Sequence, residues 1–286
     1  MLLSAVTAVA KAVPLDTGYR IAELLSEGHR LLSPDRRRAV RSNLQVLLRN
    51  GADPDRTTGE VFRNYGRFLF EFLRGPDVDE VPHRFERWDV LEKALARRRG
   101  VILAVLHTGN WEITGARLAK AGVPVHAVAG VQLRARWTRE LGRRQARAGI
   151  RILPPGVASW RDLPRILARN EALALLIDGD VHRRAHALEL CGRPVRLPTG
   201  PARLAARTGA VLLPMFCRRD PDGGLSARFL DEVTVVDHSP AAIAAATEEM
   251  GRRLEKVLHD LASQWLIFRR FFGDPPPQNG SPERAA

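Results

Sequence analysis

Hydrophobic residues recur at helical spacing along the first quarter of the chain, residues 1–75. Ser33 before Pro34 is typical of a helix start, because a serine side chain can cap free backbone N–H groups and proline has no N–H to satisfy. A second amphipathic helix is predicted to end at Gly75, which a proline follows. Its apolar stripe contains Val61, Phe62, Tyr65, Phe68, Leu69 and Phe72. This region is therefore predicted to be helical.

From about residue 84 the pattern changes to short apolar runs that alternate with helical segments. The run at residues 101–106, VILAVL, is apolar throughout, which is typical of a strand buried on both faces. Further strands are predicted at 123–128, 150–153, 173–177 and 210–216, and helices at 90–98, 113–121, 134–148, 160–169, 200–208 and 240–265. We therefore expect an α/β fold with a central, mostly parallel sheet flanked by helices, preceded by the N-terminal helical region.

The pattern divides the chain into a helical, membrane-associating region at residues 1–80, an α/β core at 81–273 and a disordered Pro- and Gly-rich tail at 274–286. The first 15 residues are apolar, but Lys11 interrupts them and no basic residue precedes them, which argues against a cleaved signal peptide. They could lie in a membrane interface or pack on the core as an ordinary first helix. No apolar run is long enough to span a bilayer.

The chain is strongly basic, with 45 Lys and Arg against 32 Asp and Glu, a formal charge of +13. Nearly all of the positive charge is arginine, whose planar fork of donors suits phosphate. Such a surface attracts nucleic acid, anionic lipid head groups or an acidic carrier protein. Cys191 and Cys217 form no CxxC pair, so a disulfide framework or a structural zinc site is not expected, and a reducing, cytosolic setting fits.

In the segment VILAVLHTGNWE, residues that could take part in a reaction directly follow the buried strand. Ligands bind at this end of the strands in open α/β sheets. His107 follows the strand directly, and a neutral imidazole suits the removal of a proton from a hydroxyl. Glu112 lies near the start of the next helix and could fold back to hold one ring nitrogen. Backbone N–H groups at that helix start could receive an oxyanion. The alternative is that His107 only caps the turn.

HTGNWE resembles the HX4D/E motif of the lysophospholipid acyltransferase superfamily, in the branch of the bacterial lipid A biosynthesis (lauroyl/myristoyl) acyltransferases, which includes the phosphatidylinositol mannoside acyltransferases. Three further segments are similar to motifs of that branch and occur in the same order: RAVRSNL at residues 38–44, LPTGPARLA at 197–205 and QWLIFRR at 264–270. The resemblance covers about residues 30–272.

The resemblance implies transfer of a fatty acyl chain from acyl-carrier protein or acyl-CoA to a hydroxyl of a glycolipid, of the lipid A precursor or phosphatidylinositol mannoside type. It implies no metal, no cofactor beyond that co-substrate and no acyl-enzyme, with His107 as the base and Glu112 as its partner. The expected place is the cytoplasmic face of the inner or plasma membrane, attached peripherally to anionic lipid. The aromatic stripe of residues 61–72 could then line an acyl-binding groove or be ordinary core.

Four further residues are candidates for binding substrate. Asn110 lies in the turn after His107, and Asp178 ends a predicted strand, where it could orient a group or belong to a simple turn. Arg143 or Arg144 could hold a phosphate or lie on a solvated helix face. Glu189 falls where the mannoside branch is thought to have a second functional glutamate. Residues 129–134, AGVQLR, replace the "RPxxNP" stretch that the family often has, so the acceptor stays open.

Two other functions compete with acyl transfer. A hydrolase could use the same His–Glu pair on water. A non-enzymatic nucleic-acid-binding protein would explain the charge, although the arginines are spread along the chain without a helix-turn-helix, zinc-finger or aromatic RNA-binding signature. His182 and His186 have the i, i+4 spacing of metal ligands, but no third ligand is evident and a solvated loop is favoured.

Overall fold

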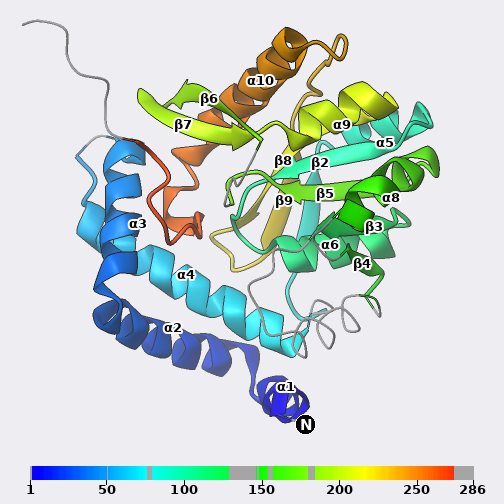
Figure 1. Ribbon diagram of the computed structural model, residues 1–286. Coiled ribbons are helices and arrows are strands. Elements are labelled where there is room, and N and C mark those ends of the chain that lie inside the picture. Colours follow the sequence, from blue (N-terminus) through cyan, green and yellow to red (C-terminus); the bar gives the residue numbers. More distant parts are fainter. Residues whose placement is uncertain are drawn as a thin grey trace, which may run out of the picture.

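The computed structural model describes residues 2–49, 51–75, 79–128, 146, 148–153, 157–179 and 184–273. Its N-terminal part is helical, as predicted, with α1 (Leu2–Ala12), α2 (Leu15–Leu32), α3 (Pro34–Leu47) and α4 (Pro54–Arg74). These helices lie together on one side of the molecule, with α4 between α2 and the sheet (Figure 1). The helices α2 and α4 approach closely because Gly66 has no side chain: a Cβ there would lie 2.5 Å from the Ala22 carbonyl oxygen.

The predicted helix start at Ser33 and the predicted helix end at Gly75 are close to the observed ones. The helix α3 begins at Pro34 after Ser33, although the Ser33 side chain makes no capping hydrogen bond. The helix α4 begins about two turns before its apolar stripe, at Pro54, where the Asp53 side chain accepts a hydrogen bond from the Asp55 N–H. It ends at Arg74, before Gly75.

Among the residues that the structure describes, seven strands form one sheet in the order β1-β9-β8-β2-β5-β3-β4. Neighbouring strands are parallel except β8 and β9. The strands are β1 (His83–Glu86), β2 (Val101–Val105), β3 (Val125–Val128), β4 (Ile150–Leu153), β5 (Ala172–Leu176), β8 (Val211–Arg219) and β9 (Leu225–Phe229). The predicted α/β class with a mostly parallel sheet is confirmed.

Two apolar cores lie on the two faces of the sheet, and alternate residues of β2 contribute to each. Ile102 and Ala104 face one core, and Leu103 and Val105 face the other. The first face is covered by α8 (Val157–Ala168), α9 (Gly200–Thr208) and α10 (Pro240–Leu258), and the second by α5 (Trp88–Ala96) and α6 (Trp111–Lys120). The strand is therefore buried on both sides, as its sequence predicted.

Some elements differ from the predictions. The last helix ends at Leu258 instead of residue 265, and a short 3-10 helix, η1 (Ala262–Gln264), follows. The chain then becomes extended because Trp265 forms a β-bridge with Thr108. The edge strand β1, its neighbour β9 and the hairpin of β6 (Ala185–Leu190) and β7 (Arg193–Pro198) were not predicted, since they are short and carry charged residues. The tail at 274–286 and most of the helix expected at 134–148 lie outside the described residues. The proposed division near residue 80 stays a prediction.

Candidate active site

His107 lies two residues after β2, in the loop that leads into α6. Its carbonyl oxygen accepts a hydrogen bond of 2.8 Å from the N–H of Leu266, so the chain beyond η1 fixes the loop. Gly109, in the same loop, has φ +57°, and a Cβ there would lie 2.7 Å from the backbone nitrogen of Arg218. Only glycine lets this loop pack so closely on β8.

The His107 ring is held by the carboxylate of Asp178. Nδ1 of the ring lies 2.7 Å from Asp178 Oδ1, and the His107 backbone N–H donates to Oδ2 at 2.9 Å. The indole N–H of Trp265 also donates to Oδ2, at 2.7 Å. The Asp178 side chain is 1% exposed, whereas that of His107 is 22% exposed. Because β2 and β5 are parallel neighbours, the residues that follow them meet at one edge of the sheet.

Burial alone would raise the pKa of Asp178, but the neighbouring His107 ring and the hydrogen bonds from His107 and Trp265 outweigh it, so the pKa is lowered. The carboxylate therefore stays ionised and accepts a hydrogen bond from Nδ1, which carries the proton. This fixes the ring tautomer and leaves Nε2 with the lone pair that a general base needs. The Trp111 ring meets the imidazole edge-to-face, with centroids 4.8 Å apart.

Asn110, a predicted substrate-binding residue, is completely buried and acts as the N-cap of α6. Its Oδ1 accepts hydrogen bonds from the N–H groups of Glu112 and Ile113, at 3.1 and 3.0 Å. The N–H groups at this helix start were expected to be available to an oxyanion, but the side-chain cap occupies two of them. The other end of the amide donates to Glu71 at 2.6 Å. Asn110 thus shapes the loop through both ends of its side chain.

Glu112 is the second residue of α6. The sequence suggested that it holds one nitrogen of His107, but in the structure Nδ1 of the ring contacts Asp178. The part that Glu112 plays stays a prediction.

The remaining candidates lie in different surroundings. Glu189 is exposed on β6, away from the sheet that carries His107, and Arg143 and His182 lie outside the described residues. His186 belongs to β6 and not to a loop, and its Nε2 lies 2.7 Å from Glu248. In the described part of the chain, no group of three or more His, Cys, Asp or Glu residues could hold a metal ion.

Two residues that the sequence did not single out complete the site. Trp265 bridges the loop and the buried carboxylate. Arg269 donates through Nη2 to the carbonyl oxygens of Asp178, at 2.9 Å, and Gly179, at 2.6 Å, and so clamps the turn after β5. Both lie in the QWLIFRR segment that resembled the end of the family, which was the signal available.

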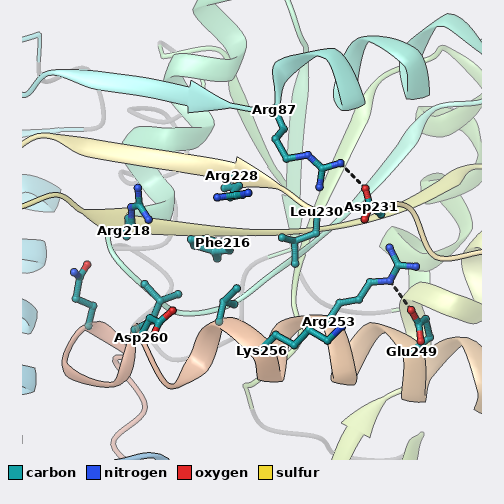
Figure 2. Close-up of a pocket in the computed structure, with 13 residues that line it drawn as sticks. Arg87, Phe216, Arg218, Arg228, Leu230, Asp231, Glu249, Arg253, Lys256 and Asp260 are labelled. Carbon is teal, nitrogen blue, oxygen red and sulfur yellow. Dashed lines mark hydrogen bonds and ion pairs between the residues drawn. The ribbon is translucent and has the colours of Figure 1, made fainter.

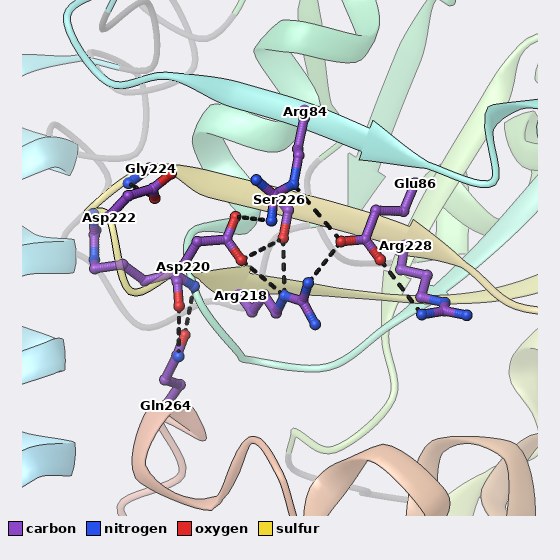
Figure 3. Close-up of polar contacts among 10 residues, drawn as sticks. Arg84, Glu86, Arg218, Asp220, Asp222, Gly224, Ser226, Arg228 and Gln264 are labelled. Atoms are coloured by element: carbon purple, nitrogen blue, oxygen red, sulfur yellow. Dashed lines mark hydrogen bonds and ion pairs between the residues drawn. The ribbon is translucent and has the colours of Figure 1, made fainter.

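A network of charges fixes the end of β8 on which this loop packs (Figure 3). Arg218 donates to Glu86 at 2.7 Å and to Asp220 at 2.9 Å. The Gln264 side chain accepts from the backbone N–H of Arg219 at 2.6 Å and donates to its carbonyl oxygen at 2.9 Å. These bonds join η1 to β8, one residue before Trp265.

A basic cleft of about 530 Å³ lies between α10 and the strands β8 and β9 (Figure 2). Its basic and acidic residues are Arg87, Arg218, Arg228, Arg253 and Lys256, against Asp231, Glu249 and Asp260. Its apolar residues are Phe216, Leu230, Val257 and Leu261. Gln264 lines the end nearest to Trp265. The cleft thus combines an apolar surface with an excess of cations.

The lowered pKa of Asp178 makes a prediction about stability. Because the folded-state value lies below the unfolded value of about 3.9, ionised Asp178 stabilises the fold above that pH, and this contribution is lost as the pH falls through the folded-state pKa. We expect Asp178→Asn to lower the free energy of unfolding by about 1–3 kcal/mol at pH 7. Urea unfolding at pH 7 and pH 3 should show that the difference shrinks in acid. A difference that does not depend on pH would contradict the assignment.

Comparisons with known proteins identify the family of the chain. The family model described as bacterial lipid A biosynthesis acyltransferase matches residues 1–273. A phosphatidylinositol mannoside acyltransferase of Mycobacterium tuberculosis is 28% identical over 247 residues, 79% of this chain and 76% of the relative. The protein of that name from Mycolicibacterium smegmatis is 28% identical over 240 residues, 80% of this chain and 77% of the relative. The non-enzymatic alternative is therefore wrong. The chain belongs to the bacterial lipid A biosynthesis acyltransferase family and is an acyltransferase of lipid biosynthesis.

Proposed function

We propose that the protein moves a fatty acyl chain from a thioester, acyl-CoA or acyl-carrier protein, to a hydroxyl of a phosphatidylinositol mannoside-type glycolipid. The observation that carries this proposal is the pairing of His107 with a buried, ionised Asp178 at the carboxyl end of β2. The names of the two relatives support the acceptor class.

In this mechanism Nε2 of His107 removes the proton from the acceptor hydroxyl while the oxygen attacks the thioester carbonyl carbon. The new C–O bond forms a tetrahedral intermediate. Its collapse breaks the C–S bond, and the departing thiolate takes the proton back from Nε2. Asp178 stabilises the imidazolium between these steps without itself taking the proton. Glu112 is proposed to assist from the start of α6, and no acyl-enzyme or metal is needed.

The N-terminal helices support peripheral attachment to a membrane. Large apolar side chains are exposed on these helices: Val6, Val9, Ile21, Leu24, Leu25, Leu31 and Leu32. An apolar groove of about 470 Å³ lies between α1, α2 and α4. In the part of the chain that the structure describes, no helix could cross a membrane. We propose that α1 and α2 lie on the lipid surface, with the glycolipid acceptor in the same layer.

Acyl transfer is tested by mass spectrometry of purified protein incubated with palmitoyl-CoA or palmitoyl-carrier protein and a total lipid extract. We expect a new acylated glycolipid with wild type and a rate lower by about 10²–10⁴-fold with His107→Ala. Glu112→Gln should lower kcat more than it raises KM. Free fatty acid as the sole product would favour the hydrolase. Substantial activity in a folded His107→Ala variant would refute the base assignment.

Membrane attachment is tested by sedimentation with anionic phospholipid vesicles. Each buried leucine contributes about 1.5–3 kcal/mol, so we expect Leu24→Ser with Leu32→Ser to weaken vesicle binding by tenfold or more. Val236→Ser is the matched control, because Val236 is 83% exposed but lies outside the N-terminal helices. Equal binding by both variants and wild type would remove α2 from the membrane contact.

The basic cleft is proposed to bind the phosphates of the CoA donor. We expect Arg253→Gln with Lys256→Gln to raise KM for palmitoyl-CoA about tenfold, the equivalent of one charged hydrogen bond, and to leave KM for palmitoyl-pantetheine unchanged. Arg252→Gln is the control, because Arg252 pairs with the same Glu249 as Arg253 but does not line the cleft. An equal change in KM for both donors would show that the cleft does not bind the phosphates.

A further inference from the structure

A buried carboxylate on α4 joins three separate segments of the fold. Glu71 is fully buried, and each of its oxygens accepts hydrogen bonds. Oε2 accepts from the Asn110 amide at 2.6 Å. Oε1 accepts from the hydroxyl of Tyr19, on α2, and from the guanidinium of Arg219, at the end of β8. A single side chain thus contacts the helix α2, the loop between β2 and α6 that carries His107, and the sheet.

Such a group is costly to build into a fold. The Arg219 side chain is only 8% exposed, so both charges of the pair are removed from water. Burial alone would lower the pKa of Arg219, but Glu71 and Tyr19 outweigh it and raise the pKa. Burial and Glu71 together raise the pKa of Tyr19, so its hydroxyl stays a donor. A buried ion pair often stabilises a protein less than apolar residues of the same size would, which suggests a role other than stability.

Glu71 determines which way the Asn110 amide points. The Oδ1 of Asn110 caps α6, and its Nδ2 needs an acceptor on the opposite side. Glu71 is that acceptor. The cap in turn sets where α6 begins, and its first residue, Trp111, packs against the His107 ring. The helix α4 supports Trp111 directly as well, because Phe68 stacks on it with centroids 4.4 Å apart.

The same carboxylate also reaches the other side of His107. The backbone N–H of Arg219 donates to the Gln264 side chain, and the Arg219 carbonyl oxygen accepts from it (Figure 3 shows Gln264 at the end of β8). Gln264 is the residue before Trp265. Trp265 donates to Asp178. Glu71 is therefore linked to both sides of His107. It is linked to Trp111 through Asn110, and to Trp265 through Arg219 and Gln264.

We propose that Glu71 is a positioning residue for acyl transfer, which holds Asn110 and therefore Trp111 in the orientation that the His107 ring requires. Tyr19 makes this orientation depend on α2, the helix that exposes the apolar side chains. The kinetic test of this role rests on the proposed function. The spectroscopic test rests on the contacts of Glu71 alone.

The test compares three variants by kcat, KM and the NMR signals of the His107 ring. We expect Glu71→Gln to lower kcat by up to about 10²-fold at little change in KM, because a displaced catalytic group costs rate and not binding. Tyr19→Phe should lower kcat by a smaller factor. Ser26→Ala is the matched control: it also removes a hydroxyl bond between α2 and α4, of 2.6 Å to the Phe62 carbonyl oxygen, but does not touch Glu71. It should keep wild-type kcat.

Glu71→Gln leaves Arg219 buried without its charge partner and could fail to fold. The double variant Glu71→Met with Arg219→Met removes both charges and gives Asn110 no acceptor. We expect it to be folded, with kcat still low. Wild-type kcat in this double variant, or an equal loss of kcat in Tyr19→Phe and Ser26→Ala, would overturn the proposal.

The NMR readout separates this proposal from the proposed function. We expect the His107 ring signals to shift in the Glu71 and Tyr19 variants and not in Ser26→Ala, because Trp111 lies against the ring. If wild type transfers no acyl chain but the signals shift in this way, the function fails and the positioning role stands. Unchanged signals in the folded Glu71 variants would refute the positioning role.

Discussion

The ionised carboxylate of Asp178 lies entirely inside the protein, and such a group is tolerated only when hydrogen-bond donors surround it. The donors come from two distant segments, the loop after β2 and the chain after η1. Each must therefore lie at a fixed place. This requirement explains why α10 ends at Leu258: a helix continued to residue 265 could not bring the Trp265 indole to Asp178 while pairing its backbone with Thr108. His107, the proposed base, is thus oriented by the same bonds that close the fold.

A buried carboxylate that needs several donors occurs twice, once on each side of the loop that carries His107. Asp178 accepts from His107 and Trp265, and Glu71 accepts from Asn110, Tyr19 and Arg219. Between them the loop has little freedom, because Gly109 already packs against the backbone of β8. Two buried carboxylates therefore define the position of a short segment whose own sequence contains a flexible glycine. The catalytic geometry depends on these long-range bonds more than on the local turn.

The sequence could predict the parts of the site that depend on local pattern. The apolar run before His107 identified a central strand, and the rule for parallel sheets placed His107 at its functional end. Asp178 was a candidate for orienting a group, but the sequence could not identify it as the partner of the ring, because it is 71 residues away and strand order is not visible in the sequence. Glu112 was closer in sequence and matched the motif. Glu71 was hidden for a similar reason: within an amphipathic helix it looks like a solvated residue, and only the packing of α2, α4 and β8 buries it.

A lipid acyltransferase must bring together two substrates of different solubility. In the proposed arrangement the glycolipid reaches the enzyme from the membrane beneath α1 and α2, and a charged thioester donor arrives from water. These helices and α10, which borders the basic cleft, lie on opposite sides of the molecule (Figure 1). The His107 loop is linked to both sides, through Glu71 and Tyr19 towards α2 and through Trp265 and Gln264 towards the cleft. An apolar face and a cationic cleft on one small fold would then keep the two substrates apart until they meet at Nε2 of His107.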